Sequence, residues 1–416
     1  MSSIPEELYH VIIVRLPAKS LLACKFVCRN WFKLISNPEF VKSHLHLSLT
    51  TTSGNNNPNI CISSGKKIYS TKYDSLLSSA SLKEFKDNNA VEMYCPFDSL
   101  NHVELLGSCN GVIFLTFRGD EYNGGKGFLC LWNPVTREYK QIPGSPNDCS
   151  INEIGMYAFG YDDKIDTYKV FETVEMERTN SPKYNVELET MEWVYTKSYK
   201  VNVYTLESNS WKSIQLIPYE FAVNAGVLVD GYPHWLAHAG GRIPFIISLD
   251  VSNERFEEMK LPKENPDEGH RGKILGVLEG SLCILSHVRY TCYEVWMMQE
   301  YGVQESWTKC HVITHKSVML GSPLWKMWSI KNGEILLKKA YENLVLYDPW
   351  NSSAKDLKIV YLRVLNVENL VESLVSLKSG TFTGSKNNRT NGTKMKRSKK
   401  NDRRNHTNPK RLKKNN

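Results

Sequence analysis

Two histidine pairs are the residues of this sequence with the clearest capacity for chemistry. His234 and His238 lie four positions apart in HWLAH, and His311 and His315 repeat that spacing in HVITH. Two histidines four apart on a helix can bind zinc, but Trp235 stands where a zinc hydrolase carries its glutamate, and the segment has the composition of a strand. In a strand, residues four apart share one face for packing. We therefore predict no metal site at either pair.

Three further patterns resemble chemical motifs without completing them. The stretch GDEYNGGKG, from Gly119 to Gly127, lacks the spacing and the Ser or Thr of a phosphate-binding loop. No Gly-x-Ser-x-Gly nucleophile elbow occurs in the sequence. Cys24 and Cys28 lie on a predicted helix without the His or Cys partners that zinc requires. We expect a non-catalytic protein with no cofactor and no metal.

The sequence favours a soluble protein of the cytoplasm, the nucleus or both. Its opening residues, MSSIPEELYHVIIVRLPAKS, place Glu6, Glu7 and Arg15 around a short apolar stretch, unlike a signal peptide. No run approaches the roughly 18 apolar residues that cross a bilayer. The 10 cysteines are scattered from Cys24 to Cys310, and in such a chain we expect free thiols.

Charge divides the chain into a body and a tail. The net charge of +8 suggests a nucleic-acid partner at first sight. From Thr381 onward, however, thirteen Lys and Arg stand against one acidic residue, Asp402, so this end carries +12 and the first 380 residues carry −4 (8 − 12). The basic excess belongs to a polar tail, residues 379–416, which we predict to be disordered.

The tail contains basic clusters spaced as in a bipartite nuclear-import signal. The alternative is a solvated end that attracts RNA without sequence preference. The one aromatic residue there, Phe382, lies outside the clusters, which argues against base stacking. The candidate import residues are Lys396, Arg397, Lys399, Lys400, Arg403, Arg404, Lys410, Arg411, Lys413 and Lys414.

Residues 1–45 have the pattern of a small all-α domain. Leu8 and Ile12 share the apolar face of a first helix, and Pro17 ends that helix and starts another. Between residues 21 and 35, apolar side chains surround too much of the helix circumference for so short a domain to bury. The excess predicts a partner surface.

The rest of the chain reads as a polar linker, 46–59, and an all-β domain, 60–378, of short apolar runs between turn residues. Five segments repeat one hairpin pattern, and they start at Trp132, Tyr204, Leu249, Trp296 and Tyr347. In the first three, an aromatic residue follows seven positions later: Tyr139, Trp211 and Phe256. The later starts are 45, 47 and 51 residues apart, which is typical of the blades of a β-propeller.

Three segments of the β domain have special predicted roles. An insertion rich in Glu and Lys, roughly 176–198, lengthens the first repeat interval and is expected to project from a loop. Together with 263–273 it is expected to carry binding specificity. Near the C-terminus, LKIVYLRVLN and NLVESLVSL predict a pair of strands that closes the ring with strands from 60 to 105.

The N-terminal motifs resemble the plant F-box. They are IPEELYHVIIVRLPAKSLL and FVCRNW, with Ile4 in place of the family's first Leu and Arg29-Asn30 in place of Lys-Ser. In that family three helices dock on a Skp-type adaptor, which a cullin scaffold holds. The resemblance implies a set of fold and adaptor-binding residues: Ile4, Pro5, Leu8, Ile12, Leu16, Pro17, Leu21, Leu22, Cys28 and Trp31.

The β domain resembles the F-box-associated domain and, within it, the S-locus F-box proteins. The matching motifs are GSCNG at 107–111, WNPVTR at 132–137, FGYD with DTYKV at 159–170, and WMMQEYGVQESW at 296–307. The resemblance implies the substrate-recognition subunit of an SCF-type (Skp–cullin–F-box) ubiquitin ligase. Its kelch-like propeller would bind a protein for ubiquitination and proteasomal degradation, such as an S-RNase in pollen self-incompatibility. The alternative is a nuclear or RNA-associated protein that uses the basic tail.

Overall fold

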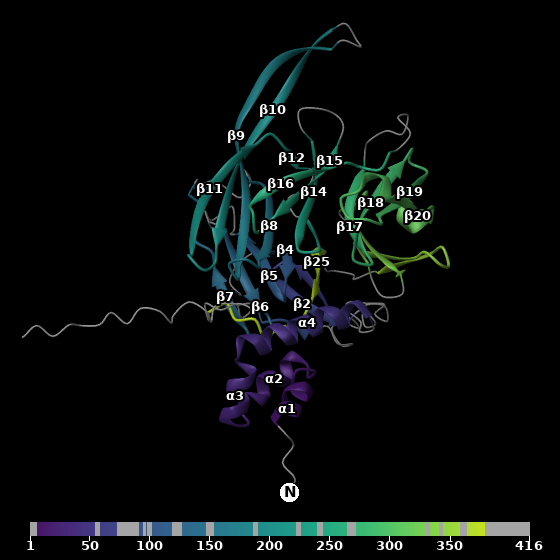
Figure 1. Cartoon of the computed structure of the whole chain (residues 1–416). Coiled ribbons are helices and arrows are strands. Elements are labelled where there is room, and N and C mark those ends of the chain that lie inside the picture. Colours follow the sequence, from purple (N-terminus) through teal and green to yellow (C-terminus); the bar gives the residue numbers. More distant parts are fainter. Residues whose placement is uncertain are drawn as a thin grey trace, which may run out of the picture. The chain divides into compact units, whose positions relative to one another are not determined.

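A group of N-terminal helices precedes a β-propeller in the computed structural model of the chain (Figure 1). Helices and propeller fall in one unit, Met1–Ser385, and the second unit, Lys386–Asn416, lies outside the described residues. The structure describes residues 6–54, 59–72, 91–94, 97, 102–118, 127–146, 154–185, 190–221, 226–238, 244–263, 272–329, 333–340, 344–357 and 364–378.

Four helices form the N-terminal group: α1 (Glu6–Ile13), α2 (Ala18–Cys24), α3 (Arg29–Ile35) and α4 (Pro38–Gly54). Pro17 is the N-cap of α2, in agreement with the prediction that it separates two helices. The helix α4 continues to residue 54, so the first part of the predicted linker 46–59 is helical. The reason is that Leu45 is buried and Leu47 still packs against the hydrophobic cluster beside it.

The β domain consists of propeller blades, as the sequence predicts. The described residues form three four-stranded sheets, one five-stranded sheet and one eight-stranded sheet. The eight-stranded sheet is two four-stranded halves, joined where Gly276 and Val277 of one half pair in parallel with Met327 and Trp328 of the other. Gly276 is required there, because a Cβ would overlap the side chain of Met327. Counting the halves separately gives six blades.

The first three blades follow one another along the chain, except for one strand from the C-terminus. Blade 1 contains β1 (Asn59–Ser64), β2 (Lys67–Lys72), β3 (Val91–Glu92) and β25 (Val364–Leu370). Blade 2 contains β4 (His102–Cys109), β5 (Val112–Arg118), β6 (Phe128–Asn133) and β7 (Glu138–Gln141). Blade 3 contains β8 (Ile154–Asp162), β9 (Thr167–Asn185), β10 (Thr190–Thr205) and β11 (Ser210–Ile217).

The remaining blades include two short helical turns among the described residues, η3 and α7. Blade 4 contains β12 (Glu220–Phe221), β13 (Val227–Val229), β14 (Tyr232–His238), β15 (Phe245–Asp250) and β16 (Arg255–Met259). Blade 5 contains β17 (Lys273–Leu278), β18 (Ser281–Val288), β19 (Cys292–Met298), η3 (Gln304–Ser306) and β20 (Trp307–Ile313). The helix α7 (Lys316–Met319) leads to blade 6, which contains β21 (Leu324–Ser329), β22 (Ile335–Lys339), β23 (Leu344–Asp348) and β24 (Ser353–Leu357).

The sequence repeats are the outer hairpins of the blades. Residues aligned seven positions apart in the sequence face each other across these hairpins: Trp132 and Tyr139, Tyr204 and Trp211, Leu249 and Phe256. Several of the turns begin with the same device, in which an Asn or Asp side chain accepts the backbone N–H groups two and three residues later. Asn133, Asp250 and Asp348 all do so. The repeated pattern therefore encodes the third strand, turn and fourth strand of a blade.

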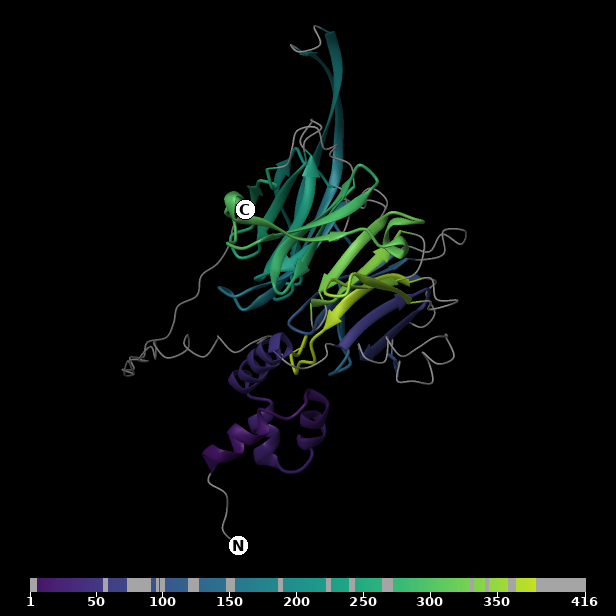
Figure 2. The same ribbon diagram turned by 90° about the vertical axis from the view of Figure 1, so that its right-hand side faces the viewer.

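The ring closes through the C-terminal strand, as predicted. β25 pairs with β1 in antiparallel register, from Asn59 opposite Leu370 to Ser64 opposite Val364 (Figure 2). The first predicted strand, LKIVYLRVLN, lies mostly outside the described residues. The second, NLVESLVSL, is a strand only at Asn369 and Leu370, which belong to β25, and residues 371–378 pair with no strand among the described residues. Side chains of blade 2 bind this backbone in place of a neighbouring strand.

The insertion predicted as a projecting loop continues two strands instead. β9 and β10 pair from Lys169 opposite Thr205 as far as Asn185 opposite Thr190. β8 pairs with β9 only as far as Val174, and β11 pairs with β10 only as far as Tyr199. The outer parts of β9 and β10 therefore form a two-stranded ribbon beyond the sheet, which Figure 1 shows in teal.

The hairpin pairs give a direct test of which repeated aromatic residues hold the fold. Trp132 is 1% exposed and lies inside a cluster with Ile113 and Cys130, whereas its partner Tyr139 is 44% exposed. We expect Trp132→Ala to lower the free energy of unfolding by about 3–5 kcal/mol, because it leaves a cavity in the core. Urea denaturation followed by circular dichroism measures the loss.

Tyr139→Ala is the matched control on the facing strand. It removes a cross-strand contact and an edge contact with the ring of Phe97 at the surface, each contributing about 0.2–1 kcal/mol. Equal losses for the two variants would contradict the division of this pair into a core residue and a surface residue.

Candidate functional site

Exposed apolar side chains on the N-terminal helices form the candidate site. Leu8, Val11 and Ile12 follow at three- and four-residue spacing on α1, so they share one face, and all three are exposed. After α2 come Phe26, which is 89% exposed, and Val27. A group of large apolar side chains left in water marks an interaction site. We call this group the apolar helix surface: Leu8, Val11, Ile12, Phe26, Val27 and Phe32.

The structure divides the residues predicted from the sequence into surface and core. Leu8, Ile12, Pro17 and Cys28 are exposed and available to a partner. Leu21 is fully buried, so it packs in the core of the helices. The partly buried residues packed against the same core are Leu16, Leu22 and Trp31. Ile4 and Pro5 lie outside the described residues.

Four members of the apolar helix surface lie outside the predicted set of adaptor-binding residues. Val11 had a signal, because it lies three residues after Leu8 on the same helix face. Phe26 and Val27 lie between α2 and α3, and Phe32 lies on α3; from the sequence each of these apolar residues could equally have been core. The three-dimensional packing of α3 and α4 decides which of them are exposed.

A buried histidine fixes the helices that carry this surface. His44 of α4 lies with Nε2 2.9 Å from the carbonyl oxygen of Leu16, in the turn between α1 and α2. Burial lowers the pKa of His44 and outweighs the opposing effects of that carbonyl and of Glu372. The imidazole is therefore neutral at pH 7, and α4 holds the α1–α2 turn through a hydrogen bond without a buried charge.

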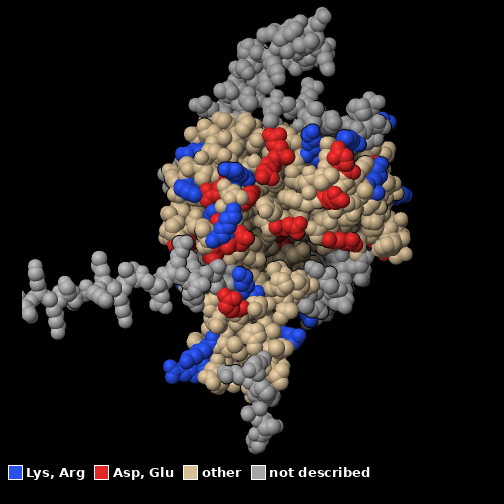
Figure 3. Space-filling view, viewed as in Figure 1, with Lys and Arg blue, Asp and Glu red and all other residues tan. Residues whose placement is uncertain are grey.

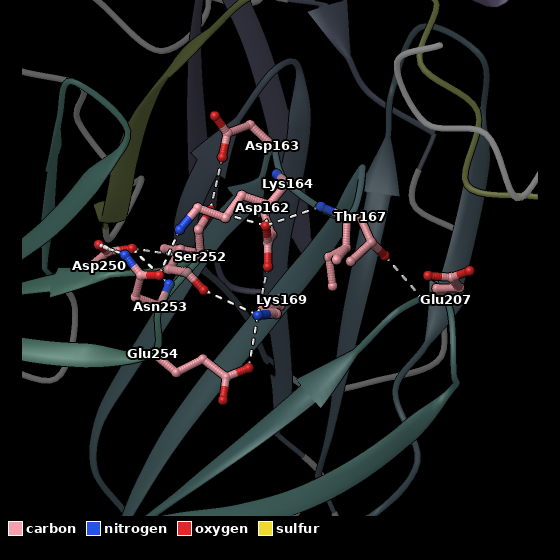
Figure 4. Close-up of polar contacts among 12 residues, drawn as sticks. Asp162, Asp163, Lys164, Thr167, Lys169, Glu207, Asp250, Ser252, Asn253 and Glu254 are labelled. Carbon is pink, nitrogen blue, oxygen red and sulfur yellow. Dashed lines mark hydrogen bonds and ion pairs between the residues drawn. The ribbon is translucent and has the colours of Figure 1, made fainter. Parts of the chain in front are cut away.

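A second polar cluster joins blades 3 and 4 inside the propeller (Figure 4). Lys169 of β9 is nearly buried, and its ammonium lies 2.7 Å from a carboxylate oxygen of Asp162 and 2.7 Å from one of Glu254. It also donates to the carbonyl oxygen of Val251, 3.2 Å away. Ser252 donates to Asp162 from the blade 4 side, at 2.9 Å.

Opposite charges in this cluster hold each other ionised. Burial alone would lower the pKa of Lys169, but Asp162 and Glu254 outweigh burial and raise it. Burial alone would raise the pKa of Glu254, but Lys169 and Lys212 outweigh it and keep that pKa below its ordinary value of 4.5. A group of fully paired charges does not exchange protons near pH 7, so the role of this cluster is structural.

Comparison with protein families matches both parts of the chain. Residues 1–43 match the F-box domain, and residues 60–373 match the F-box associated beta propeller domain. The second match covers more than half of the chain. The chain belongs to the family of F-box proteins with an associated β-propeller.

Curated relatives are similar to nearly the whole F-box protein. F-box protein CPR1 of Arabidopsis thaliana is 29% identical over 383 residues, which are 86% of this chain and 85% of the relative. F-box protein At3g07870 of the same plant is 28% identical over 395 residues, covering 86% and 88%. F-box/kelch-repeat protein At3g23880 is 26% identical over 354 residues, covering 83% and 88%. The resemblance to plant F-box proteins is confirmed, and the narrower resemblance to S-locus members stays a prediction.

One histidine of each pair in the F-box protein has a defined structural role. His234 is buried on β14, and its Nε2 lies 2.9 Å from the hydroxyl of Tyr301. Burial lowers the pKa of His234 to about 4. His315 accepts the backbone N–H of Ser317 and caps α7. In the part of the chain that the structure describes, no three His, Cys, Asp or Glu residues gather closely enough to hold a metal ion.

Surface charge does not single out another site. Figure 3 shows acidic and basic side chains interspersed over the visible face of the propeller, while the visible surface of the helices is largely uncharged. The ten candidate import residues, Lys396 to Lys414, lie outside the described residues.

The described cysteines are free. None of the described helices is both long enough and apolar enough to cross a membrane.

The cluster around Lys169 predicts a large effect of one charge. Lys169→Met leaves the buried carboxylate of Asp162 and that of Glu254 without their ammonium, which should lower the free energy of unfolding by about 3–5 kcal/mol at pH 7. Urea denaturation measures it. Lys212→Met is the control, because Lys212 pairs with the same Glu254 but is 55% exposed, and its loss should cost about 1 kcal/mol or less.

The same variant has a defined pH dependence. The pKa of Glu254 is lowered by folding, so its contribution is present above 4.5 and is lost as pH falls through the folded-state pKa. The pKa of Lys169 is raised, so its charge persists at least to its ordinary value of 10.5. The stability difference between the wild type and Lys169→Met should therefore shrink below pH 4.5. A difference that stayed constant as the pH was lowered further below 4.5 would contradict this assignment.

Proposed function

We propose that this F-box protein is the substrate-recognition subunit of an SCF-type ubiquitin ligase. Its apolar helix surface binds a Skp-type adaptor, and through the adaptor a cullin. Its propeller binds a protein that is then ubiquitinated and degraded by the proteasome. The observation that carries the proposal is the group of large apolar side chains exposed on a small helical domain that matches the F-box. Such a surface is costly in water and is stabilised by an apolar partner.

The chemistry of this function needs no catalytic residue in the chain. A receptor contributes by holding its target close to the catalytic subunit of the ligase, which raises the effective concentration of the reacting groups. The polar groups buried in the propeller fit this role, because they hold blades together. Lys169 with Asp162 and Glu254 is the clearest case.

The outer ribbon of β9 and β10 is the proposed target-binding element. The strands of a blade are antiparallel, so the turn between its second and third strands and the turn between its third and fourth strands lie at opposite ends of the blade. The ribbon extends a turn between a second and a third strand, β9 and β10. Asn133, beside the C-terminal segment, lies in a turn between a third and a fourth strand, β6 and β7. The other expected specificity segment, 263–273, lies mostly outside the described residues.

Binding and expression experiments can identify the target. The resemblance to S-locus F-box proteins makes an S-RNase the first candidate, with degradation in the cytoplasm or the nucleus as the outcome. Retention of purified S-RNases on the immobilised propeller, together with a transcript restricted to pollen, would support that role. A broadly expressed transcript and no S-RNase retention would make the chain a receptor for another protein.

The adaptor interface can be tested with one double variant. Leu8→Asp with Ile12→Asp places two charges on the exposed face of α1 and should weaken binding to a Skp-type adaptor by on the order of 100-fold or more. The fold should survive, because both side chains are about half exposed. Titration calorimetry with the purified adaptor measures the dissociation constant.

Leu216→Asp is the control for a new charge on an exposed leucine, because Leu216 lies on β11 of the propeller. It should leave adaptor binding unchanged. If the double variant binds the adaptor as tightly as the wild type does, the face of α1 is not the interface.

A further inference from the structure

The chain continues past the closing strand in a largely buried segment with no strand assignment, which we call the brace: Val371–Leu377. Its residues Ser373, Leu374, Val375 and Leu377 are all buried. No strand pairs with it among the described residues, so its backbone groups must find partners elsewhere. A segment with this burial and no ladder is held by specific side chains.

Asn133 holds the middle of the brace to blade 2. Its Nδ2 donates to the carbonyl oxygens of Val375, at 2.7 Å, and of Ser373, at 3.2 Å. Its Oδ1 accepts the N–H groups of Val135 and Thr136 and so forms the β6–β7 turn. The fully buried amide of Asn133 thus has two separable roles: its oxygen forms the turn, and its nitrogen binds the brace.

Two more residues of blade 2 complete the attachment. Glu138 accepts the hydroxyl of Ser376 at 2.8 Å and the backbone N–H of Leu377 at 2.7 Å. Gly111, in the β4–β5 turn, has φ of +77°, and a Cβ there would lie 2.5 Å from the carbonyl oxygen of Val371. The brace therefore lies against the backbone at Gly111, and any side chain at that position would push it away.

The other side of the brace contacts the F-box helices. Glu372 forms an ion pair with Lys19 of α2 at 2.9 Å. Leu374, Val375 and Leu377 belong to the same hydrophobic cluster as buried residues of the helices and of blades 2 and 3. The helical members of that cluster are Ile13, Val14, Ala18, Leu21, Ile35, Phe40, Val41 and Leu45.

We propose that the brace positions the F-box relative to the propeller, with Asn133, Gly111 and Glu138 as positioning residues. The covalent connection from α4 to β1 is one attachment, and a module attached at one point can rotate. The brace supplies a second attachment from the far end of the chain. This inference rests on the proposed receptor function, because a fixed orientation sets where the bound target lies relative to the ligase's catalytic subunit.

Asn133→Asp tests the brace without breaking the turn. The remaining Oδ1 still accepts the two turn N–H groups, as Asp250 and Asp348 do in other blades. The nitrogen donor becomes an oxygen that faces two carbonyl oxygens, so the brace is repelled. Scanning calorimetry of the full chain should show one cooperative transition for the wild type and two for the variant, one for the helices and one for the propeller.

Ligase activity gives the functional readout. With adaptor, cullin, the ligase's catalytic subunit and the conjugating enzymes added, the propeller of the wild-type chain should be ubiquitinated by the assembled ligase, and Asn133→Asp should slow this by on the order of tenfold or more. The affinity for the adaptor should not change, since the apolar helix surface is intact. Asp348→Asn is the control, because Asp348 forms the equivalent turn in blade 6 and does not bind the brace.

A glycine pair gives a second, independent comparison. Gly111→Ala adds both backbone strain and a clash with the brace, whereas Gly231→Ala adds strain at a similar φ, +84°, with no atom within 4 Å of the new Cβ. Only Gly111→Ala should separate the unfolding transition of the helices from that of the propeller. A single transition for Asn133→Asp, or identical behaviour of the two alanine variants, would overturn the proposal.

The two proposals fail separately. Calorimetry needs neither adaptor nor target, so the brace can be confirmed even if the chain binds no Skp-type adaptor. Conversely, a wild-type chain that binds the adaptor while Asn133→Asp still unfolds in one transition would keep the receptor function and remove the brace.

Discussion

Closure of the ring by β25 is the constraint on which the rest of the structure depends. Without β25, the edge of β1 in blade 1 would be left unpaired, and an unpaired edge is costly and prone to aggregation. β25 covers that edge by becoming the strand of blade 1 beside β1. It also binds its neighbours through side chains: Asn366 donates to the carbonyl oxygen of Leu105 in blade 2, and Glu368 lies 2.7 Å from the ammonium of Lys326 in blade 6.

This closure brings together parts of the chain that are farthest apart in sequence. Since β1 directly follows the helices and the brace directly follows β25, the pairing of β1 with β25 places the brace beside the F-box. The ion pair between Lys19 and Glu372 is a consequence of that pairing. A receptor that must hold its target at a fixed place relative to a ligase gains rigidity from a contact that the ring needs for its own stability.

The local patterns predicted the fold well because they repeat. The seven-residue spacing of Trp132 and Tyr139 is a hairpin register, and the structure confirms it in three blades. The segment NLVESLVSL was misread because a buried extended segment and a buried strand have the same apolar alternation. The partners that distinguish them, Asn133 and Glu138, lie about 240 residues away in the sequence. The same limit applies to Leu8 and Leu21, which both read as apolar helix residues until the packing separates surface from core.

The two kinds of buried interaction have different roles in this chain. Between blades, paired charges such as Lys169 with Asp162 contribute little net stability over apolar packing, yet they tolerate only one alignment of the blades. Between the helices and the propeller the contact is mostly apolar, and apolar surfaces can slide. Side chains that bind backbone carbonyls, as Asn133 does, restore a unique alignment there. A motif that reads as a turn signal in the sequence, WNPVTR, thus also fixes how the two domains meet.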